Sequence, residues 1–267
     1  MRMEDLDPDR SRAEYAEAAI EDLHWLGIRW HEGPDLNGPY APYEQSRRLF
    51  FYLDAWRKLL RGGFVFPCRC SRKDLEAALS APHESVSSGI VAAQSNNELE
   101  PQDDEPIYPG TCRHSENNIA QPPDPATSAI AEPGNFNWRF RVPDGEAVEF
   151  VDENLGPQKF VAGHDFGDFV VWRRDGVPSY QLACVADDAA MNITEVVRGE
   201  DLLKSTARQI LLYRALSLET PAWFHCRLVT DRNGHRLAKR HDALSLRTLR
   251  QGGVTPGQIL SAKFESF

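Results

Sequence analysis

The sequence predicts an α/β fold in which one α/β domain is interrupted by a mainly β insertion. Helical periodicity marks residues 12–26 and 43–63 in the first part of the chain. Short alternating stretches with Asp-Gly pairs between them occupy the middle, and a strand, a turn and a helix follow at 192–216. Strand–turn–helix units are typical of parallel sheets, whereas alternating stretches joined by Asp-Gly turns are typical of hairpins.

The first predicted helix covers 12–26, where apolar residues recur at helical spacing. Ser11 and Glu14 match a capping box, in which each side chain accepts a hydrogen bond from a backbone N–H at the start of the helix. Gly27 follows the last apolar position and is expected to end the helix in a left-handed conformation.

The second predicted helix covers 43–63 and ends at Gly62-Gly63. Its expected inner face consists of Leu49, Leu53, Trp56, Leu59 and Leu60. Residues 64–70 then predict a short strand that runs into a loop.

Two polar stretches, 80–107 and 114–135, lack periodicity and predict mobile insertions. The alternating segments 135–143, 147–153 and 167–183 follow, and Asp144-Gly145 and Asp175-Gly176 separate them. We interpret these segments as hairpins. Residues 192–216 complete the pattern with the strand, turn and helix of an α/β unit.

Composition narrows the class of protein. The chain has 267 residues, of which 41% are hydrophobic, and this is enough to bury a sizeable core. It has no run of about 18 apolar residues and no signal-peptide pattern, so we expect no membrane span and a cytoplasmic location. A net charge of −10 argues against indiscriminate nucleic-acid binding, although a local basic face can still hold RNA.

The cysteines suggest a metal centre. There are five, an odd number, which favours reduced thiols or metal binding over a disulfide framework. Cys68-x-Cys70 and the later Cys112 could place soft thiolate ligands around a tetrahedral zinc ion. On spacing alone, three unrelated thiols are an equally good interpretation, and nothing in the spacing singles out Tyr108 as a ligand.

Two cationic features could bind anionic substrates. Arg198 leaves a predicted strand just before a helix, where a planar guanidinium can hold a carboxylate by two hydrogen bonds; a salt bridge to Glu200 or Asp201 is the alternative. The loop 231–243 carries Arg236 and Lys239, and clustered cations suit phosphoryl or nucleotidyl transfer, or a solvated turn. The sequence contains neither a G-x-x-x-x-G-K loop nor a G-x-G-x-x-G fingerprint.

Three segments together resemble the catalytic core of class I glutamyl-tRNA synthetases: 2–12 (RMEDLDPDRSR), 167–216 and 236–240 (RLAKR). The resemblance extends over most of the chain outside the two polar stretches. It implies a nucleotide-binding, Rossmann-like class I synthetase core with a mainly β, zinc-containing insertion. The implied division is 1–67 and 177–225 for the two halves of the core, 68–176 for the insertion, and 226–267 for the lysine loop and a helical end.

The chain most resembles the short members of this family, the glutamyl-Q tRNA(Asp) synthetases. About 26 residues follow His241, too few for an independent anticodon-binding domain. The resemblance implies that L-glutamate is activated with ATP and Mg²⁺ without tRNA, and is then esterified to the queuosine cyclopentenediol in the anticodon of tRNA(Asp). A monomer with one structural Zn²⁺ is expected. Charging of tRNA(Glu) at its 3′ end, or a non-catalytic glutamate- or RNA-binding remnant, are the alternatives.

The resemblance also assigns residues by position. Glutamate would contact Glu4, Tyr180 and Arg198, Lys239 would act catalytically on the ATP phosphates with Arg236 beside it, and zinc would be held by Cys68, Cys70, Tyr108 and Cys112. Cys184 and Cys226 are expected to be packing residues.

Two departures from the family pattern are visible. Arg236-Leu237-Ala238-Lys239 replaces Lys-Leu-Ser-Lys, which keeps the cations and loses a hydroxyl. The stretch from Cys70 to Tyr108 is longer than expected, but a longer loop adds little closure entropy.

The family also begins with a strand, a His-x-Gly-His-type turn and a helix, and the sequence lacks that motif, since His24 is its first histidine. We therefore expect Met1 to be an internal methionine of a protein roughly thirty residues longer, the size of one strand–helix unit. A genuine truncation is the alternative, and it would leave a poorly soluble and inactive chain.

Overall fold

The computed structural model describes residues 1–7, 11–71, 73–75, 106–113, 132–228 and 245–261. Its helices are α1 (Ala13–Trp25), α2 (Leu49–Arg61), α4 (Tyr180–Ala190), α5 (Leu203–Ala215), α6 (Leu246–Gln251) and α7 (Pro256–Ser261), with 3-10 turns η1 (Gln45–Arg47) and η2 (Glu200–Leu202). Its strands are β1 (Val65–Cys68), β2 (Asn137–Phe140), β3 (Ala147–Asp152), β4 (Gly156–Val161), β5 (Phe169–Trp172), β6 (Glu195–Gly199) and β7 (Ala222–Cys226). None of the helices in these ranges is long and apolar enough to cross a membrane.

The chain forms two compact units, one of residues 1–49 and 226–267 and the other of residues 50–225. In the first unit, the predicted helix at 12–26 is confirmed as α1, and Gly27 ends it with φ at +93°. The predicted capping box is wrong. Arg12 is the N-cap residue and no side chain caps the helix, because the first helical residue is Ala13, one position later than the box requires. Arg247 and Arg250 on α6 both pair with Glu21 on α1 at 2.9 Å.

The second predicted helix is confirmed as α2, but it begins at Leu49 instead of residue 43. The backbone around residue 44 is held in an extended conformation by two hydrogen bonds. Met3 donates to the Tyr43 carbonyl at 2.8 Å, and Gln45 donates to the Met3 carbonyl at 3.0 Å. An extended backbone paired in this way cannot take helical dihedrals. The buried face of α2 carries Tyr52, Ala55, Trp56, Leu59 and Leu60. Leu49, predicted to face inward, is exposed.

Within the described residues, one sheet has the strand order β1-β2-β5 and is antiparallel. The predicted strand at 64–70 is confirmed as β1, and its Pro67 is tolerated because β1 lies at the edge of the sheet. Trp56 of α2 packs edge-on against Trp138 of β2, with ring centroids 5.0 Å apart. Most of the two polar stretches predicted as mobile lies outside the described residues.

The other sheet has the order β4-β3-β7-β6. A hairpin across Asp144-Gly145 is wrong, because β2 pairs with β1 and β5 whereas β3 pairs with β4. The Asp175-Gly176 turn does form, with Arg173 N–H donating to the Val177 carbonyl at 2.8 Å. The chain that follows it becomes α4 instead of the predicted strand, because Ser179 caps the N-terminus of a helix.

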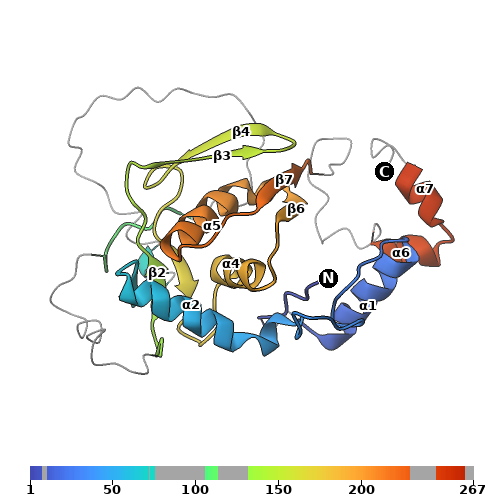
Figure 1. The fold of residues 1–267 in the computed structure, drawn as a ribbon, viewed down its shortest axis with the longest axis horizontal. Helices are drawn as coiled ribbons and strands as arrows, with labels where there is room; N and C mark the ends of the chain where they lie inside the picture. The colour runs from blue at the N-terminus through green and yellow to red at the C-terminus, as the bar shows by residue number, and fades with distance from the viewer. Residues whose placement is uncertain (8–10, 72, 76–105, 114–131, 229–244, 262–267) are drawn as a thin grey trace. The chain divides into compact units, whose positions relative to one another are not determined.

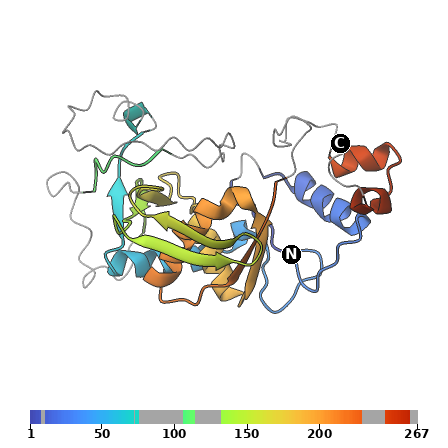
Figure 2. The ribbon, with the colours of Figure 1, turned by 90° about the horizontal axis from the view of Figure 1, so that it is seen from above.

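The predicted strand–turn–helix at 192–216 is confirmed as β6, η2 and α5. The parallel pairing expected of such a unit occurs between β3 and β7, at Asp152 and Trp223. Figure 1 shows α5 between the β3–β4 hairpin and α4, and α5 packs against both α4 and β3. Figure 2, seen from above, shows the same hairpin lying across α5. This layering directs the buried side chains of β3 and β7 toward α5.

Candidate functional site

Arg198 lies on β6, the edge strand of the four-stranded sheet, and its guanidinium meets two side chains from neighbouring elements. Its Nε donates to Nε2 of His225 on β7 at 3.2 Å, and its Nη2 donates to Oγ1 of Thr206 on α5 at 2.6 Å. The ring of Trp223, also on β7, lies 4.9 Å from the guanidinium carbon. These contacts hold the planar fork in one orientation.

Tyr180 is the other predicted glutamate-site residue that the structure brings to Arg198. It is the first residue of α4, and its hydroxyl lies 3.5 Å from Nη1 of Arg198, at the long limit of a hydrogen bond. Tyr180 is 36% exposed, so a ligand can reach this end of the guanidinium. The alternative prediction was an ion pair of Arg198 with Glu200 or Asp201. Among the described residues, the side-chain partners of Arg198 are His225, Tyr180 and Thr206 instead.

Sequence reasoning missed the pair behind Arg198. Asp152 ends β3 and His225 lies on β7, and both side chains are fully buried. Asp152 Oδ2 lies 2.6 Å from His225 Nδ1. Burial lowers the pKa of His225 below its usual value, although the hydrogen bond with Asp152 opposes this shift. The pKa of Asp152 is also lowered, because hydrogen bonds from the His225 ring and from backbone N–H groups outweigh burial. The two residues are 73 positions apart in the sequence, and no local pattern indicates that they meet.

The remaining predicted substrate residues are not part of this group. Glu4 belongs to the unit of residues 1–49 and 226–267, where it pairs with Arg2 at 3.2 Å and follows the short backbone bridge made by Met3. Arg236 and Lys239 lie outside the described residues, so their roles stay predictions.

The second candidate site is the cluster of Cys68, Cys70, Tyr108 and Cys112, which the structure brings together. The three sulfur atoms lie within 4.8 Å of one another, and Sγ of Cys70 is 3.6 Å from Sγ of Cys112. The Tyr108 hydroxyl oxygen lies 3.5 Å from the Cys68 sulfur and 3.8 Å from the Cys70 sulfur. All cysteines are free thiols.

These separations suit a tetrahedral zinc site. Zinc bonds of about 2.3 Å to sulfur and about 2.1 Å to oxygen place two sulfurs roughly 3.8 Å apart and a sulfur and an oxygen roughly 3.6 Å apart. Burial and mutual hydrogen bonds shift the pKa values of three of these groups. Burial raises the pKa of Cys70 to about 12 and raises the pKa of Tyr108. Burial opposes ionisation of Cys112 too, but hydrogen bonds with Tyr108 and the Arg69 backbone outweigh it, so the pKa of Cys112 is lowered overall. A cation that binds to such packed thiol and phenol groups displaces their protons.

The surroundings hold Tyr108 in place. Its ring packs under the buried guanidinium of Arg139, whose carbon lies 4.2 Å from the ring centroid. Its hydroxyl accepts the Cys112 N–H at 2.7 Å. The two cysteines outside the cluster differ from each other. Cys184 is buried, as predicted for a packing residue, whereas Cys226 is exposed and that prediction is wrong, because it occupies an outward position of β7.

Residues 1–262 match the family of class I tRNA synthetases (E and Q), catalytic domain. The chain belongs to this family. The predicted fold class and the family resemblance are thereby confirmed, and as a class I tRNA synthetase the chain is a ligase that uses ATP.

Individual proteins are similar to this class I tRNA synthetase over most of its length. A protein of Symbiobacterium thermophilum named glutamyl-Q tRNA(Asp) synthetase is 46% identical over 97% of the chain and 73% of its own length. A protein of Nitratidesulfovibrio vulgaris with the same name is 44% identical over 97% of the chain and 72% of its own length. The crystal structure of a glutamate-tRNA synthetase from Elizabethkingia anophelis superposes with a TM-score of 0.69 at 28% identity, covering 91% of the chain and 46% of that protein.

Proposed function

We propose that this class I tRNA synthetase activates L-glutamate with ATP and transfers it to the queuosine cyclopentenediol in the anticodon of tRNA(Asp). The observation that carries the proposal is the likeness to two proteins named glutamyl-Q tRNA(Asp) synthetase, at 46% and 44% identity. Both are aligned over 97% of this chain and over more than seven tenths of their own length.

The reaction takes place in two steps. In the first step, an α-carboxylate oxygen of glutamate attacks the α-phosphorus of ATP, the bond to pyrophosphate breaks, and glutamyl adenylate forms. In the second step, a hydroxyl of the queuosine cyclopentenediol attacks the activated carbonyl carbon and loses its proton. AMP leaves with the bonding electrons, and the product is an ester on the tRNA. The anticodon hydroxyl takes the place that the terminal ribose has in ordinary charging.

Arg198 suits the side-chain carboxylate of glutamate. The α-carboxylate must reach ATP as a nucleophile, so a two-pronged ion pair on it would oppose the first step. The γ-carboxylate takes no part in the chemistry and can stay bound throughout. A charge-assisted hydrogen bond from Nη1 of Arg198, next to the Tyr180 hydroxyl, would distinguish glutamate from an uncharged amino acid.

The other predicted residues complete the proposal. Glu4 would accept hydrogen bonds from the substrate ammonium group. Lys239 and Arg236 would lie on the ATP phosphates, which Mg²⁺ accompanies, and offset the charge that builds up at phosphorus. Cys68, Cys70, Tyr108 and Cys112 would hold one Zn²⁺, which when bound supplies a structural cross-link between two segments about 40 residues apart. We still predict that the protein is a monomer and works in the cytoplasm.

The first test is glutamate-dependent exchange of pyrophosphate into ATP without tRNA. Arg198→Ala should raise KM for glutamate by about 10- to 150-fold, because a charge-assisted pair contributes roughly 1.5–3 kcal/mol. Arg214→Ala is the matched control: this arginine pairs with Glu146 at 3.0 Å on the surface of the same unit, and its loss should leave KM unchanged.

The second test uses labelled glutamate and tRNA(Asp) with or without queuosine, followed by nuclease cleavage. Label in the anticodon fragment of the queuosine-containing tRNA alone is expected. Label at the 3′ end of tRNA(Glu) would favour ordinary charging instead. Glutamate binding without pyrophosphate exchange would favour a non-catalytic binding protein.

A further inference from the structure

The guanidinium of Arg198 is already half engaged by its own protein. Nε and Nη2 donate to His225 and Thr206, and the plane of the group lies near the ring of Trp223. These partners occupy one edge of the fork, so the Nη1 side near Tyr180 is the side that remains for a substrate. The orientation of the guanidinium depends on whether Nε2 of His225 presents a lone pair or a proton to Nε of Arg198.

The hydrogen bonds of Asp152 decide which nitrogen of His225 carries the proton. Asp152 Oδ1 accepts the backbone N–H groups of Asn154 at 3.1 Å and Leu155 at 2.8 Å, and Oδ2 accepts the His225 backbone N–H at 3.1 Å. A carboxylate surrounded by N–H donors is ionised and can only accept. The His225 Nδ1, 2.6 Å from Oδ2, must therefore carry a proton and donate it.

The other ring nitrogen of His225 faces a cation. With Nδ1 protonated in a neutral ring, Nε2 has a lone pair, and this lone pair accepts Nε–H of Arg198 at 3.2 Å. Thr206 Oγ1 lies 3.0 Å from the same nitrogen and accepts Nη2–H of Arg198. A proton on Nε2 would set a ring N–H donor against Nε–H of Arg198, and in a doubly protonated ring two positive charges as well, so the guanidinium would have to turn away.

We propose that Asp152 and His225 are positioning residues, which orient the Arg198 guanidinium toward the substrate carboxylate by keeping the lone pair of His225 on Nε2. The inference rests on the proposed role of Arg198 in glutamate binding. It goes beyond that role because it makes the affinity for glutamate depend on a buried pair that does not touch the substrate.

The pair also makes glutamate binding depend on pH. The charged groups around His225 are Asp152 on β3, Arg198 on β6 and Asp201 on η2, and the neighbouring Thr206 on α5 is uncharged. Burial lowers the pKa of His225, the two carboxylates raise it, and the Arg198 charge lowers it, with a lowered pKa as the net result. His225 is therefore neutral at neutral pH. KM for glutamate should rise as the pH falls below the usual histidine range and His225 becomes protonated.

The decisive variants are Asp152→Asn and His225→Gln. In Asp152→Asn, the amide oxygen stays with the N–H groups of Asn154 and Leu155 and keeps the His225 backbone N–H, which lies 3.3 Å from Oδ1 in the natural chain. The amide NH₂ then faces Nδ1 and forces the proton onto Nε2. KM for glutamate should rise by about ten- to a hundredfold with kcat little changed, the loss of one charge-assisted hydrogen bond. His225→Gln keeps an acceptor near the position of Nε2, and this acceptor cannot be protonated. This variant should therefore retain most of the affinity of the natural chain for glutamate, and its KM should not rise at low pH.

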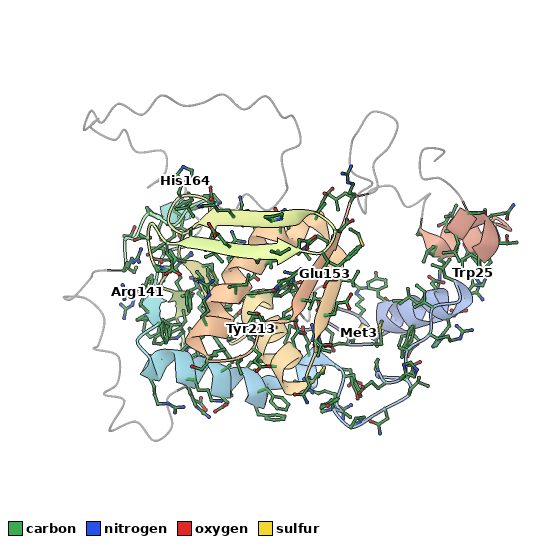
Figure 3. All side chains as sticks on the ribbon, turned by 45° about the horizontal axis from the view of Figure 1, so that its top comes forward. Met3, Trp25, Arg141, Glu153, His164 and Tyr213 are labelled. Atoms are coloured by element: carbon green, nitrogen blue, oxygen red, sulfur yellow. The ribbon has the colours of Figure 1, made fainter. Side chains whose placement is uncertain are left out.

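His164→Gln is the matched control, since His164 pairs with Asp165 at 2.8 Å but is exposed. Figure 3 labels His164 and Glu153, the neighbour of Asp152, at opposite ends of the β3–β4 hairpin. This control should change neither KM nor its pH profile. Nitrogen-15 NMR of labelled histidine adds a readout that packing alone would not move: the His225 proton should be on Nδ1 in the natural chain and on Nε2 in Asp152→Asn.

The outcomes separate the inference from the function. An unchanged KM in Arg198→Ala overturns the proposed role of Arg198, and this inference with it. A large loss in Arg198→Ala with an unchanged KM in Asp152→Asn, or a proton on Nε2 in the natural chain, overturns the inference alone. If Asp152→Asn does not fold, the pH profiles of the natural chain and His225→Gln decide, and identical profiles overturn it.

Discussion

Removing the Tyr108 hydroxyl tests whether an unusual oxygen completes the zinc site. This oxygen lies 3.5 Å from the Cys68 sulfur and 3.8 Å from the Cys70 sulfur, and it accepts the Cys112 N–H at 2.7 Å. Two roles are therefore combined in one atom. As a hydrogen-bond acceptor it stabilises the fold with or without metal, whereas as a ligand it acts only when zinc is bound.

The two roles predict different magnitudes for Tyr108→Phe. Loss of the hydrogen bond should lower the free energy of unfolding by about 1 kcal/mol in both the zinc-free and the zinc-bound protein, since Cys112 is only partly buried. Loss of an oxygen ligand should weaken zinc binding by at least about 10- to 100-fold, the magnitude typical of losing a hydrogen-bond partner behind a ligand. That is a further ~1.4 to 2.7 kcal/mol, which appears only in the zinc-bound protein.

The assay is urea unfolding of the zinc-free and zinc-saturated proteins, with zinc affinity measured by competition against a chromogenic chelator. Tyr52→Phe is the control, because its hydroxyl donates to Asp187 at 2.8 Å inside the core and its loss should cost the same in both forms. Equal losses in both forms for Tyr108→Phe, with unchanged zinc affinity, would refute the role of Tyr108 as a ligand. Failure of the natural chain to bind zinc at all would refute the metal centre.

Two further predictions concern stability. The indole N–H of buried Trp56 has no hydrogen-bond partner among the described residues, whereas that of Trp138 donates to the Pro133 carbonyl at 2.7 Å. Trp56→Phe should therefore stay within about 1 kcal/mol of the natural chain, while Trp138→Phe should lose roughly 2–3 kcal/mol in urea unfolding followed by circular dichroism. A larger loss for Trp56→Phe would contradict this reasoning. The lowered pKa of His225 means that the unfolded chain binds more protons as the pH falls below 6.5, so stability is complete above that pH and declines below it. Urea midpoints at several pH values should show this decline in the natural chain and a smaller one in His225→Gln, and parallel pH profiles would contradict it.

Much of the candidate site could be predicted from the sequence because its members follow local patterns. Arg198 comes directly after a run of β-branched residues and just before a helix, so its place at the end of a strand follows from chain order. Cys68 and Cys70 are two residues apart, and their convergence needs only a turn. The resemblance to class I synthetases added Tyr108, which spacing alone did not indicate.

Strand pairing was harder to predict. An Asp-Gly pair at 144–145 is a common hairpin turn, yet the strands on either side of it belong to different sheets. The start of α2 was also misplaced, since two hydrogen bonds with Met3, about 40 residues earlier, hold the backbone around Glu44 in an extended bridge. In both cases a distant segment competed successfully with the local preference.

The sequence by itself determined the helices α1, α2 and α5, the α/β class and the family, because periodicity and motif residues act over a few neighbouring positions. Only the tertiary structure decided which strands pair and what lies behind Arg198. Asp152 and His225 are 73 residues apart and look like ordinary positions of alternating strands. They meet because β3 and β7 pair in parallel, and a buried charge is stable only where that pairing supplies its hydrogen bonds.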